Sequence, residues 1–202
     1  QGNVVDYKNG GDSACWTGTY LGGLAFRYAE TGDPAALADL RHALGGISAL
    51  LDVNGARGLL ARLAAPETSP VGQDIVRDGA YGRATINGQT WVGLQGGRGI
   101  SRDQYQGCFF GLALAHDLVG DPVVKQECAE RIKQMLDYIV ANNWLVTEDR
   151  PTAMAGARPS VPTGWAGVGY QRATFLLIGE RLWPGRYAAE LARFDREEEI
   201  EE

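Results

Sequence analysis

The chain is poor in the residue types that bind metals and cross-link small domains. Three of its 202 residues are cysteine and two are histidine, and it contains neither a CxxC pair nor an HExxH motif. Cys15, Cys108 and Cys128 are odd in number and far apart, which excludes a disulfide scaffold and a recognisable zinc motif. We expect Cys15 and Cys108, which lie in apolar helical runs, to be small core residues, and one disulfide bridge stays possible. The sequence therefore implies no metal and no cofactor.

Long apolar runs and an excess of basic residues are also lacking. No segment approaches about 18 consecutive apolar residues, so we expect no membrane span, and no signal peptide is recognisable. The formal charge of −6 comes mainly from the tail at 195–202, without which the charge is only −1. A charge this close to neutral provides no excess of basic residues for binding nucleic acid. We expect the acidic tail to be a solvated, frayed end.

What the chain does contain is a recurring pair of helices. Residues 12–33 are apolar on every side and include Gly18, Gly22 and Gly23, which predicts a buried helix closely approached by another backbone. The run ends at TGDP, residues 31–34. There a glycine typical of a helix C-terminus is followed by an aspartate that can cap the next helix and by a proline at its first position. The next helix, to about residue 52, has one apolar stripe with a polar back. The first hairpin thus pairs a buried helix with an amphipathic one.

The same plan returns 89 residues later and predicts the fold class. Trp16 corresponds to Tyr105, Gly18 to Gly107, Tyr20 to Phe109 and Gly22 to Gly111, and a partial third copy begins at Thr163. Repeated helix pairs predict a stacked or circular array, here with an inner barrel of first helices and an outer shell of second helices. We therefore expect an all-α domain spanning 1–202, a toroid or partial toroid with hairpins at about 12–52, 103–142 and 163–194.

Two long connections separate these hairpins. The first, 53–100, contains two short strand patterns around Asn87-Gly88, which is typical of a β-hairpin with a type I′ turn. Its glycine-rich stretch at 93–99 lacks the lysine and hydroxyl residue of a P-loop, so we expect a flexible loop. The second connection is 143–162. Each follows a second helix and precedes a first helix, so we expect both at the same end of the array.

Three segments carry a resemblance to a known superfamily. They are DSACWTGTYLGGLAFRYAETGDP at 12–34, NGARGLLAR at 54–62 and SRDQYQGCFFGLALAHDLVGDP at 101–122. They resemble bacterial proteins with the six-hairpin, (α/α)6-toroid glycosidase-like fold. That resemblance implies a carbohydrate-active protein whose carboxylates and aromatic sugar platforms lie at the mouth of the inner barrel. Since this chain has three hairpins at most, it also implies a fragment, a half-toroid or a subunit completed by association.

Asp12 and Asp103 are the candidate catalytic residues. Both stand at the start of a first helix, at the expected mouth, and glycoside hydrolysis uses two carboxyl groups flanking the scissile bond. Both also have structural explanations. Asp12 can cap its helix, and Asp103 lies in the first turn after a Ser101–Gln104 capping box, where the helix dipole favours an acid. Asp103 is the better candidate because the equivalent repeat position is Ala14.

Aromatic and basic side chains supply candidate substrate-binding residues: Trp16, Tyr105, Trp165, Trp91, Arg98 and Arg102. The first three recur at one repeat position, where an aromatic ring could stack on a sugar or pack in the core. Trp91 would be an exposed platform or a loop anchor. The two arginines could hold a uronic acid or a sulfate, or pair with a neighbouring acid.

The sequence leaves two functions open. One is glycoside hydrolase-like activity on a poly- or oligosaccharide, and the other is a non-catalytic glycan-binding or self-assembly module. Besides carbohydrate, the expected partner is a second copy or the rest of a longer chain, because a half-toroid would expose apolar flanks. The first residue is Gln1, from which we expect a processed N-terminus or an excerpt. The sequence does not decide the cellular location of the protein, although it favours a secreted or periplasmic one.

Overall fold

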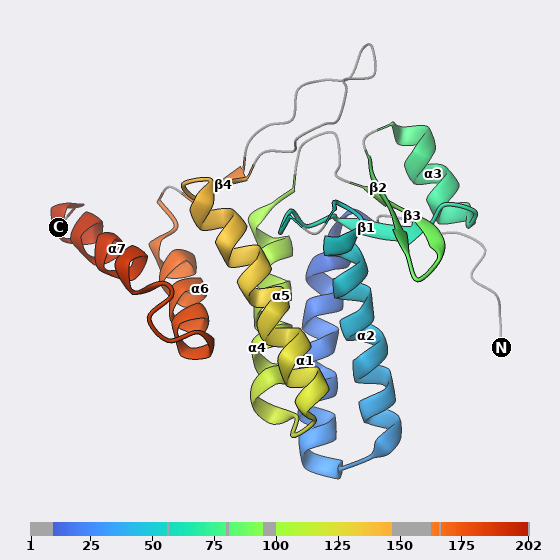
Figure 1. The fold of residues 1–202 in the computed structure, drawn as a ribbon, viewed down its shortest axis with the longest axis horizontal. Coiled ribbons are helices and arrows are strands. Elements are labelled where there is room, and N and C mark those ends of the chain that lie inside the picture. Colours follow the sequence, from blue (N-terminus) through green and yellow to red (C-terminus); the bar gives the residue numbers. More distant parts are fainter. Residues whose placement is uncertain are drawn as a thin grey trace.

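A computed structural model describes residues 10–55, 57–79, 81–94, 100–146, 163–165 and 167–201. Within these ranges the fold is mostly helical, as expected, with one three-stranded and one two-stranded sheet. The helices are α1 (Ser13–Thr31), α2 (Pro34–Asp52), α3 (Pro70–Asp78), α4 (Arg102–Leu118), α5 (Pro122–Ala141), α6 (Gly169–Leu182) and α7 (Ala188–Glu201), and a short 3-10 turn at Gly10–Asp12 precedes α1. The strands are β1 (Leu63–Pro66), β2 (Tyr81–Ile86), β3 (Gln89–Leu94), β4 (Leu145–Val146) and β5 (Thr163–Gly164) (Figure 1).

The pairs α1/α2 and α4/α5 form two helical hairpins that stand side by side (Figure 1). Both turn in the same way. Asp33 caps α2 by accepting the backbone N–H of Ala35, and Asp121 caps α5 by accepting those of Val123 and Val124. A proline follows each aspartate at the first helical position, where its missing N–H costs nothing. The repeated GDP sequence therefore produces the same hairpin turn twice.

The first helices of the two hairpins run in the same direction. Near their starts, the backbone N–H of Cys15 donates to Oε1 of Gln104 at 3.0 Å. Further along, Gly22 of α1 faces the side chain of Phe110 on α4. The second helices are parallel too, since Arg41 pairs with Asp121 and, later along both helices, Asp52 pairs with Arg131. The hairpins thus form two layers of parallel helices. We call α1 and α4, together with α6 described below, the first-helix layer, and α2 and α5 the second-helix layer.

Glycine allows α1 and α4 to approach each other closely. A Cβ added at Gly18 would overlap the carbonyl of Gly107, and one added at Gly107 or Gly111 would overlap the backbone of α1. The prediction that these repeated glycines serve backbone contact is confirmed. Gly23 is different, because a Cβ there would meet nothing within 4 Å.

The prediction that α1 is buried on every side is wrong. Its side facing α2 and α4 is buried, but Trp16, Tyr20 and Phe26 on the other side are 67%, 58% and 50% exposed. The second-helix layer covers only one face of the first-helix layer. No other described element covers the opposite face of α1, and hydrophobic patterning cannot show that a neighbour is missing.

The connection after α2 forms the small sheet at one end of the helices (Figure 1). The predicted hairpin is present as β2 and β3, and its turn residues Asn87 and Gly88 have φ values of 51° and 77°, as a type I′ turn requires. Two elements were missed. Strand β1 joins the other side of β3 in the order β1-β3-β2, and α3 packs on the sheet. Strand β4 lies at the same end of the helices (Figure 1).

The third hairpin begins later than its sequence pattern indicates. Residues 163–164 are not helical but pair as β5 with β4, and α6 starts only at Gly169. Helix α6 runs parallel to α4, because Gln171 bonds to Gln106 and Phe175 stacks on Phe109 one turn further along. The tail prediction also needs correction, since α7 continues to Glu201.

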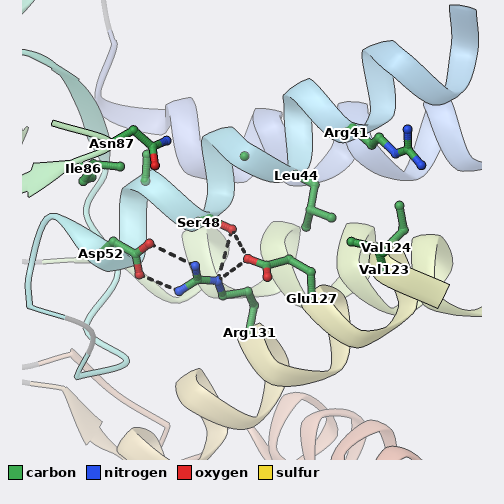
Figure 2. A pocket seen from close by; sticks show the side chains of 12 residues that line it. Arg41, Leu44, Ser48, Asp52, Ile86, Asn87, Val123, Val124, Glu127 and Arg131 are labelled. Carbon is green, nitrogen blue, oxygen red and sulfur yellow. Dashed lines mark hydrogen bonds and ion pairs between the residues drawn. The ribbon is translucent and has the colours of Figure 1, made fainter. Parts of the chain in front are cut away.

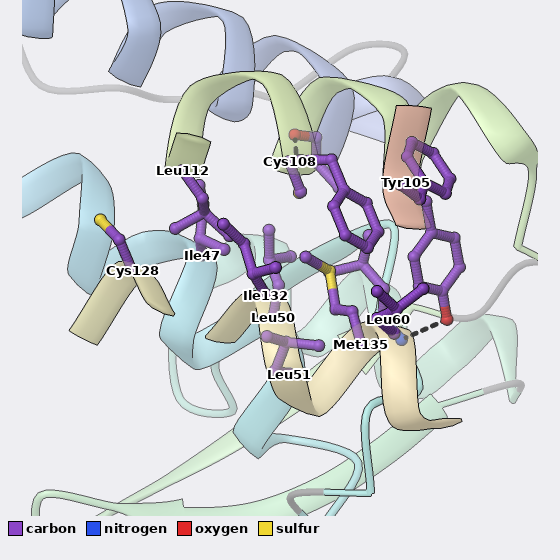
Figure 3. Close-up of a cluster of buried hydrophobic side chains, with 14 of the residues drawn as sticks. Ile47, Leu50, Leu51, Leu60, Tyr105, Cys108, Leu112, Cys128, Ile132 and Met135 are labelled. Carbon is purple, nitrogen blue, oxygen red and sulfur yellow. Dashed lines mark hydrogen bonds between the residues drawn. The ribbon is translucent and has the colours of Figure 1, made fainter. Parts of the chain in front are cut away.

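The main core fills the space between the two layers (Figure 3). Leu112 of α4, Ile47 of α2 and Ile132 of α5 are fully buried within it. Cys108 is a core residue as expected and Cys128 is also fully buried, but Cys15 is only partly buried, and all three cysteines are free thiols. Burial, followed by the neighbouring Glu127 charge, raises the pKa of the Cys128 thiol to about 12. Among the described helices, none is long and apolar enough to cross a membrane.

Candidate functional site

One amide joins the two candidate carboxylates at the N-terminal ends of α1 and α4. Gln104 is fully buried, and its Nε2 donates to Oδ1 of Asp12 at 3.0 Å and to Oδ2 of Asp103 at 3.2 Å. Its Oε1 accepts the backbone N–H of Cys15. Because both carboxylate oxygens bind the same nitrogen, they can be no more than about 6 Å apart. The fold therefore brings together two acids that are 91 positions apart in the sequence.

The structure gives these residues different roles from the expected caps. Asp12 occupies the N-cap position of α1 and Ser101 that of α4, but neither side chain makes a capping hydrogen bond. Gln104 does not close a capping box on α4, because its side chain reaches across to α1. The capping-box prediction is therefore wrong. The spacing of Ser101 and Gln104 is right for a box, but it cannot show that another helix offers a better partner.

Arg62 lies beside Asp12, one of the two acids. Nη1 of Arg62 is 3.5 Å from Oδ1 of Asp12 and also donates to the carbonyl of Gly11. The arginine side chain is mostly buried at 17% exposure, whereas that of Asp12 is 60% exposed. Sequence reasoning did not select Arg62, although it ends the second segment that carries the family resemblance. Its position just before β1 brings it to the start of α1, where its carbonyl accepts the N–H of Ala14.

Cys15 is the one thiol close to the carboxylates. Burial raises its pKa, and the charges of Asp103 and Asp12 raise it further. The thiolate is the reactive form of cysteine. A thiol whose pKa is raised by burial and by two acids is therefore unsuited to act as a nucleophile at neutral pH. The carboxylates are therefore the candidate reactive groups at this end of the helices.

The three repeat-related aromatic residues lie in different environments. Trp16 is exposed and stands one helical turn from Asp12. Tyr105 and Trp165 are fully buried and meet edge to face, with ring centroids 5.6 Å apart. The hydroxyl of Tyr105 also accepts the N–H of Leu60 and donates to the carbonyl of Gly58. For Tyr105 and Trp165 the structure thus favours core packing, and only Trp16 offers a ring to a ligand.

The remaining candidates contribute less to this site. Trp91 lies on β3, partly buried against the main core, which agrees with a loop anchor. Arg102 is exposed at the start of α4, with Nη1 3.4 Å from the carbonyl of Gly164. Arg98 lies outside the described residues. The two acids, Gln104, Arg62 and Trp16 are therefore the described residues that make up the candidate site.

A groove of about 370 Å³ lies elsewhere, between α2, α5 and the tip of the β2–β3 hairpin (Figure 2). Arg131 forms one wall and binds both carboxylate oxygens of Asp52, at 2.5 and 3.0 Å. Its Nε donates to Glu127 at 2.8 Å and to the hydroxyl of Ser48 at 3.1 Å. Burial alone would raise the Glu127 pKa, but the hydrogen bonds from Ser48 and Arg131 lower it below its ordinary value. These charges bind one another, so we interpret the cluster as a brace between α2 and α5.

No protein-family model, curated protein or solved structure matches this chain.

Proposed function

We propose that this chain is a carbohydrate-active protein, a glycoside hydrolase-like enzyme built on part of an (α/α) toroid, with its site at the start of α1 and α4. The observation that carries the proposal is the sharing of Gln104 by Asp12 and Asp103. Hydrolysis of a glycosidic bond typically requires two carboxyl groups close together, and the ends of these parallel helices hold such a pair. The two-layer arrangement of parallel helices supports the toroid part of the proposal.

The separation of the carboxylates favours one stereochemical course. Retaining glycosidases hold their two carboxyl groups about 5 Å apart, and inverting enzymes hold them about 6.5 to 9.5 Å apart to admit a water molecule. The upper limit of about 6 Å set by the shared amide suits a retaining mechanism. Arg62 places a positive charge beside Asp12, which suits the carboxylate that attacks the sugar. Asp103 is then the acid that protonates the leaving oxygen.

The surroundings of the acids support a carbohydrate ligand. Trp16 presents a largely exposed ring one turn from Asp12, and such a ring suits the apolar face of a pyranose. Arg102 is exposed next to Asp103 in the sequence and can pair with the carboxylate of a uronic acid or with a sulfate.

A glycan-binding module without catalysis is the second candidate. Asp103, the acid of the proposed enzyme, is exposed, and the side chain of Asp12 is 60% exposed. A general acid in a glycosidase usually has its pKa raised by an enclosed, apolar setting. Carboxylates that stay in contact with water can still accept hydrogen bonds from sugar hydroxyls, and Trp16 would serve binding equally well.

A panel of oligo- and polysaccharides, including uronic-acid polymers, tests both candidates by binding and by release of reducing ends. For the enzyme we expect Asp103→Asn to lower turnover at least about a hundredfold with binding retained, and the product to keep the anomeric configuration of the substrate. Asp39→Asn, at an exposed position on α2, is the matched control and should leave turnover unchanged. Wild-type turnover in Asp103→Asn would sink the catalytic assignment. Binding without turnover by the wild type selects the module, and no binding at all overturns both.

A further inference from the structure

The exposed large apolar side chains lie almost entirely on one layer of the fold. Eight such residues occur in the described part of the chain, and six of them belong to the first-helix layer. They are Trp16, Tyr20 and Phe26 on α1, Phe110 on α4, and Tyr170 and Leu177 on α6. Helix α2 has none, and neither do those residues of α7 whose side chains the structure describes. Scattered apolar residues need no explanation, but a set concentrated on one layer marks an interaction surface.

Charge on this exposed face is confined to its ends. Asp12, Arg102 and Asp103 lie where α1 and α4 begin, and Arg27, Asp117 and Arg181 lie towards the ends of the helices. Between them the exposed positions are uncharged: Trp16, Thr19, Tyr20, Gly23, Phe26, Gln106, Phe110, Tyr170, Thr174 and Leu177. An aromatic centre without charge, bordered by charged residues, is the composition of a protein–protein interface.

The internal repeat indicates what kind of surface fits there. Tyr20 occupies the repeat position of Phe109. Phe109 is only 1% exposed, because Phe175 of α6 stacks on it with ring centroids 4.0 Å apart. Trp16 likewise occupies the position of Tyr105, which is covered by the buried ring of Trp165. Helix α1 therefore carries the aromatic residues that, on α4, receive the third hairpin of the same chain.

The third hairpin has a matching surface on its free side. Tyr170 and Leu177 of α6 are 70% and 57% exposed. The exposed residues of α1 and α6 also lie at matching positions along the helix axes. Gly18 lies level with Gly107, and Gln106 lies level with Gln171. Trp16 therefore stands at the level of Tyr170, and Tyr20 stands within about one turn of Leu177.

We propose that a second copy of this chain covers the exposed face of α1 with the exposed face of its α6, so that the protein forms a homodimer. A two-fold axis parallel to the helices keeps the contacting helices parallel, as α4 and α6 are within the chain, and makes both α1–α6 contacts at once. The contact joins Tyr20 of one copy to the neighbourhood of the other copy's Leu177. The contact also covers Trp16, so in the dimer this ring cannot be the sugar platform of the proposed function, whereas Asp12 and Asp103 lie outside the named contact.

Sedimentation or light scattering from about 1 to 100 μM tests the dimer directly. We expect a molar mass of twice the 21.7 kDa of the chain, and self-association weakened more than about tenfold by Tyr20→Glu or by Leu177→Glu, because each buries an unpaired charge. Val123→Glu is the matched control, since Val123 is 70% exposed on α5, away from the proposed contact. Two variants on different helices guard against a folding defect in either one.

Cysteine cross-linking tests the pairing of α1 with α6. An oxidised mixture of Tyr20→Cys and Leu177→Cys chains should give more covalent dimer than either variant alone. A mass of one chain at the highest concentration would overturn the proposal, and so would dimers unaffected by both charge substitutions. Loss of glycan turnover in Asp103→Asn with the dimer intact would bear on the proposed function alone.

Discussion

Gly18 of α1 and Gly107 of α4 lie against each other with no room for a side chain between them, because a Cβ on Gly18 would overlap the carbonyl of Gly107. The two residues occupy the same position in the internal repeat, 89 residues apart. The repeat thus preserves the point where two parallel backbones meet. This contact fixes the register of α1 on α4, and that register brings Gln104 to Asp12.

Substituting Gly18 by alanine should therefore destabilise the fold. Helix propensity alone would favour alanine by about 1 kcal/mol, but the added methyl group must push the two helices apart. We expect the free energy of unfolding to fall by about 2 to 3 kcal/mol, as for other overpacked sites. Urea unfolding followed by circular dichroism measures it.

Gly23→Ala is the control on the same helix. Gly23 is exposed and has no neighbour within 4 Å of the added carbon, so this variant should be more stable than the wild type by up to about 1 kcal/mol. Equal stabilities for the two variants would contradict the close approach of α1 and α4.

The hydroxyl of Tyr105 supports the chain as it leaves α2. It accepts the N–H of Leu60 at 3.1 Å and donates to the carbonyl of Gly58 at 3.2 Å, in a fully buried setting. Tyr105→Phe leaves both backbone groups buried without this partner, so we expect a loss of about 1 to 3 kcal/mol in stability. Tyr20→Phe, at an exposed position, should change stability by less than about 0.5 kcal/mol. Thermal unfolding of both variants checks this, and a Tyr105→Phe protein as stable as the wild type would show that the hydroxyl is not needed.

Local patterns in the sequence were sufficient to predict the hairpins and their turns. Asp33-Pro34 and Asp121-Pro122 cap α2 and α5 as expected, and Asn87-Gly88 forms the predicted hairpin turn. In each case the determining contacts lie within a few residues, so the sequence contains them directly. The strand β1, which was not predicted, depends instead on a contact with a distant residue range. It is four residues long and exists because β3 pairs with it.

The candidate site was only partly predictable, because its geometry depends on contacts between distant residues. Asp12 and Asp103 were identified as candidates, but Gln104 was interpreted as part of a cap on its own helix. Tyr105 and Trp16 share a repeat position yet differ completely in burial. Within the first-helix layer, α4 has a neighbour on each side, α1 on one and α6 on the other. Among the described elements of that layer, α1 has a neighbour on one side only, namely α4. Repetition in sequence predicts similar helices but not similar surroundings.

Gln104 should be required for the arrangement of the two acids. Its amide binds Asp12, Asp103 and the N–H of Cys15 from a fully buried position. Gln104→Leu removes all three hydrogen bonds and leaves the Cys15 N–H without its acceptor, so we expect a loss of about 1 to 3 kcal/mol in stability. Glycan binding should weaken with it if the acids form the site.

The exposed Gln126 of α5 provides the matched control. Gln126→Leu should leave both stability and binding near wild-type values, since surface substitutions usually change stability by less than about 0.5 kcal/mol. If Gln104→Leu behaved in the same way, the shared amide would be incidental to both fold and site.

Arg131 should be more important for stability than any exposed ion pair of this chain. Its side chain is 17% exposed and binds Asp52 of α2 across the two hairpins, and Glu127 one turn earlier on its own helix α5 (Figure 2). Arg131→Met keeps the stem but leaves the two acids facing each other without a cation. We expect stability at neutral pH to fall by about 2 to 4 kcal/mol. Arg77→Met, which breaks an exposed pair with Asp74 on α3, should cost less than about 1 kcal/mol.

The same cluster predicts how stability depends on pH. Hydrogen bonds from Ser48 and Arg131 overcome the effect of burial and hold the Glu127 pKa below its ordinary value of 4.5. The folded protein therefore binds this proton less readily than the unfolded chain. Glu127 contributes stability that is present above about pH 4.5 and is lost as the pH falls through the lower, folded-state pKa.

Glu127→Gln removes this titration. Its stability should change less steeply than that of the wild type as the pH is lowered from about 5, although the variant is less stable at neutral pH. Denaturant unfolding at a series of pH values measures both slopes, and Glu30→Gln, at an exposed position on α1, serves as the control. If wild type and Glu127→Gln lost stability in parallel over that range, the carboxylate of Glu127 would not be held ionised by Ser48 and Arg131, and the brace between α2 and α5 would have to rest on Asp52 alone.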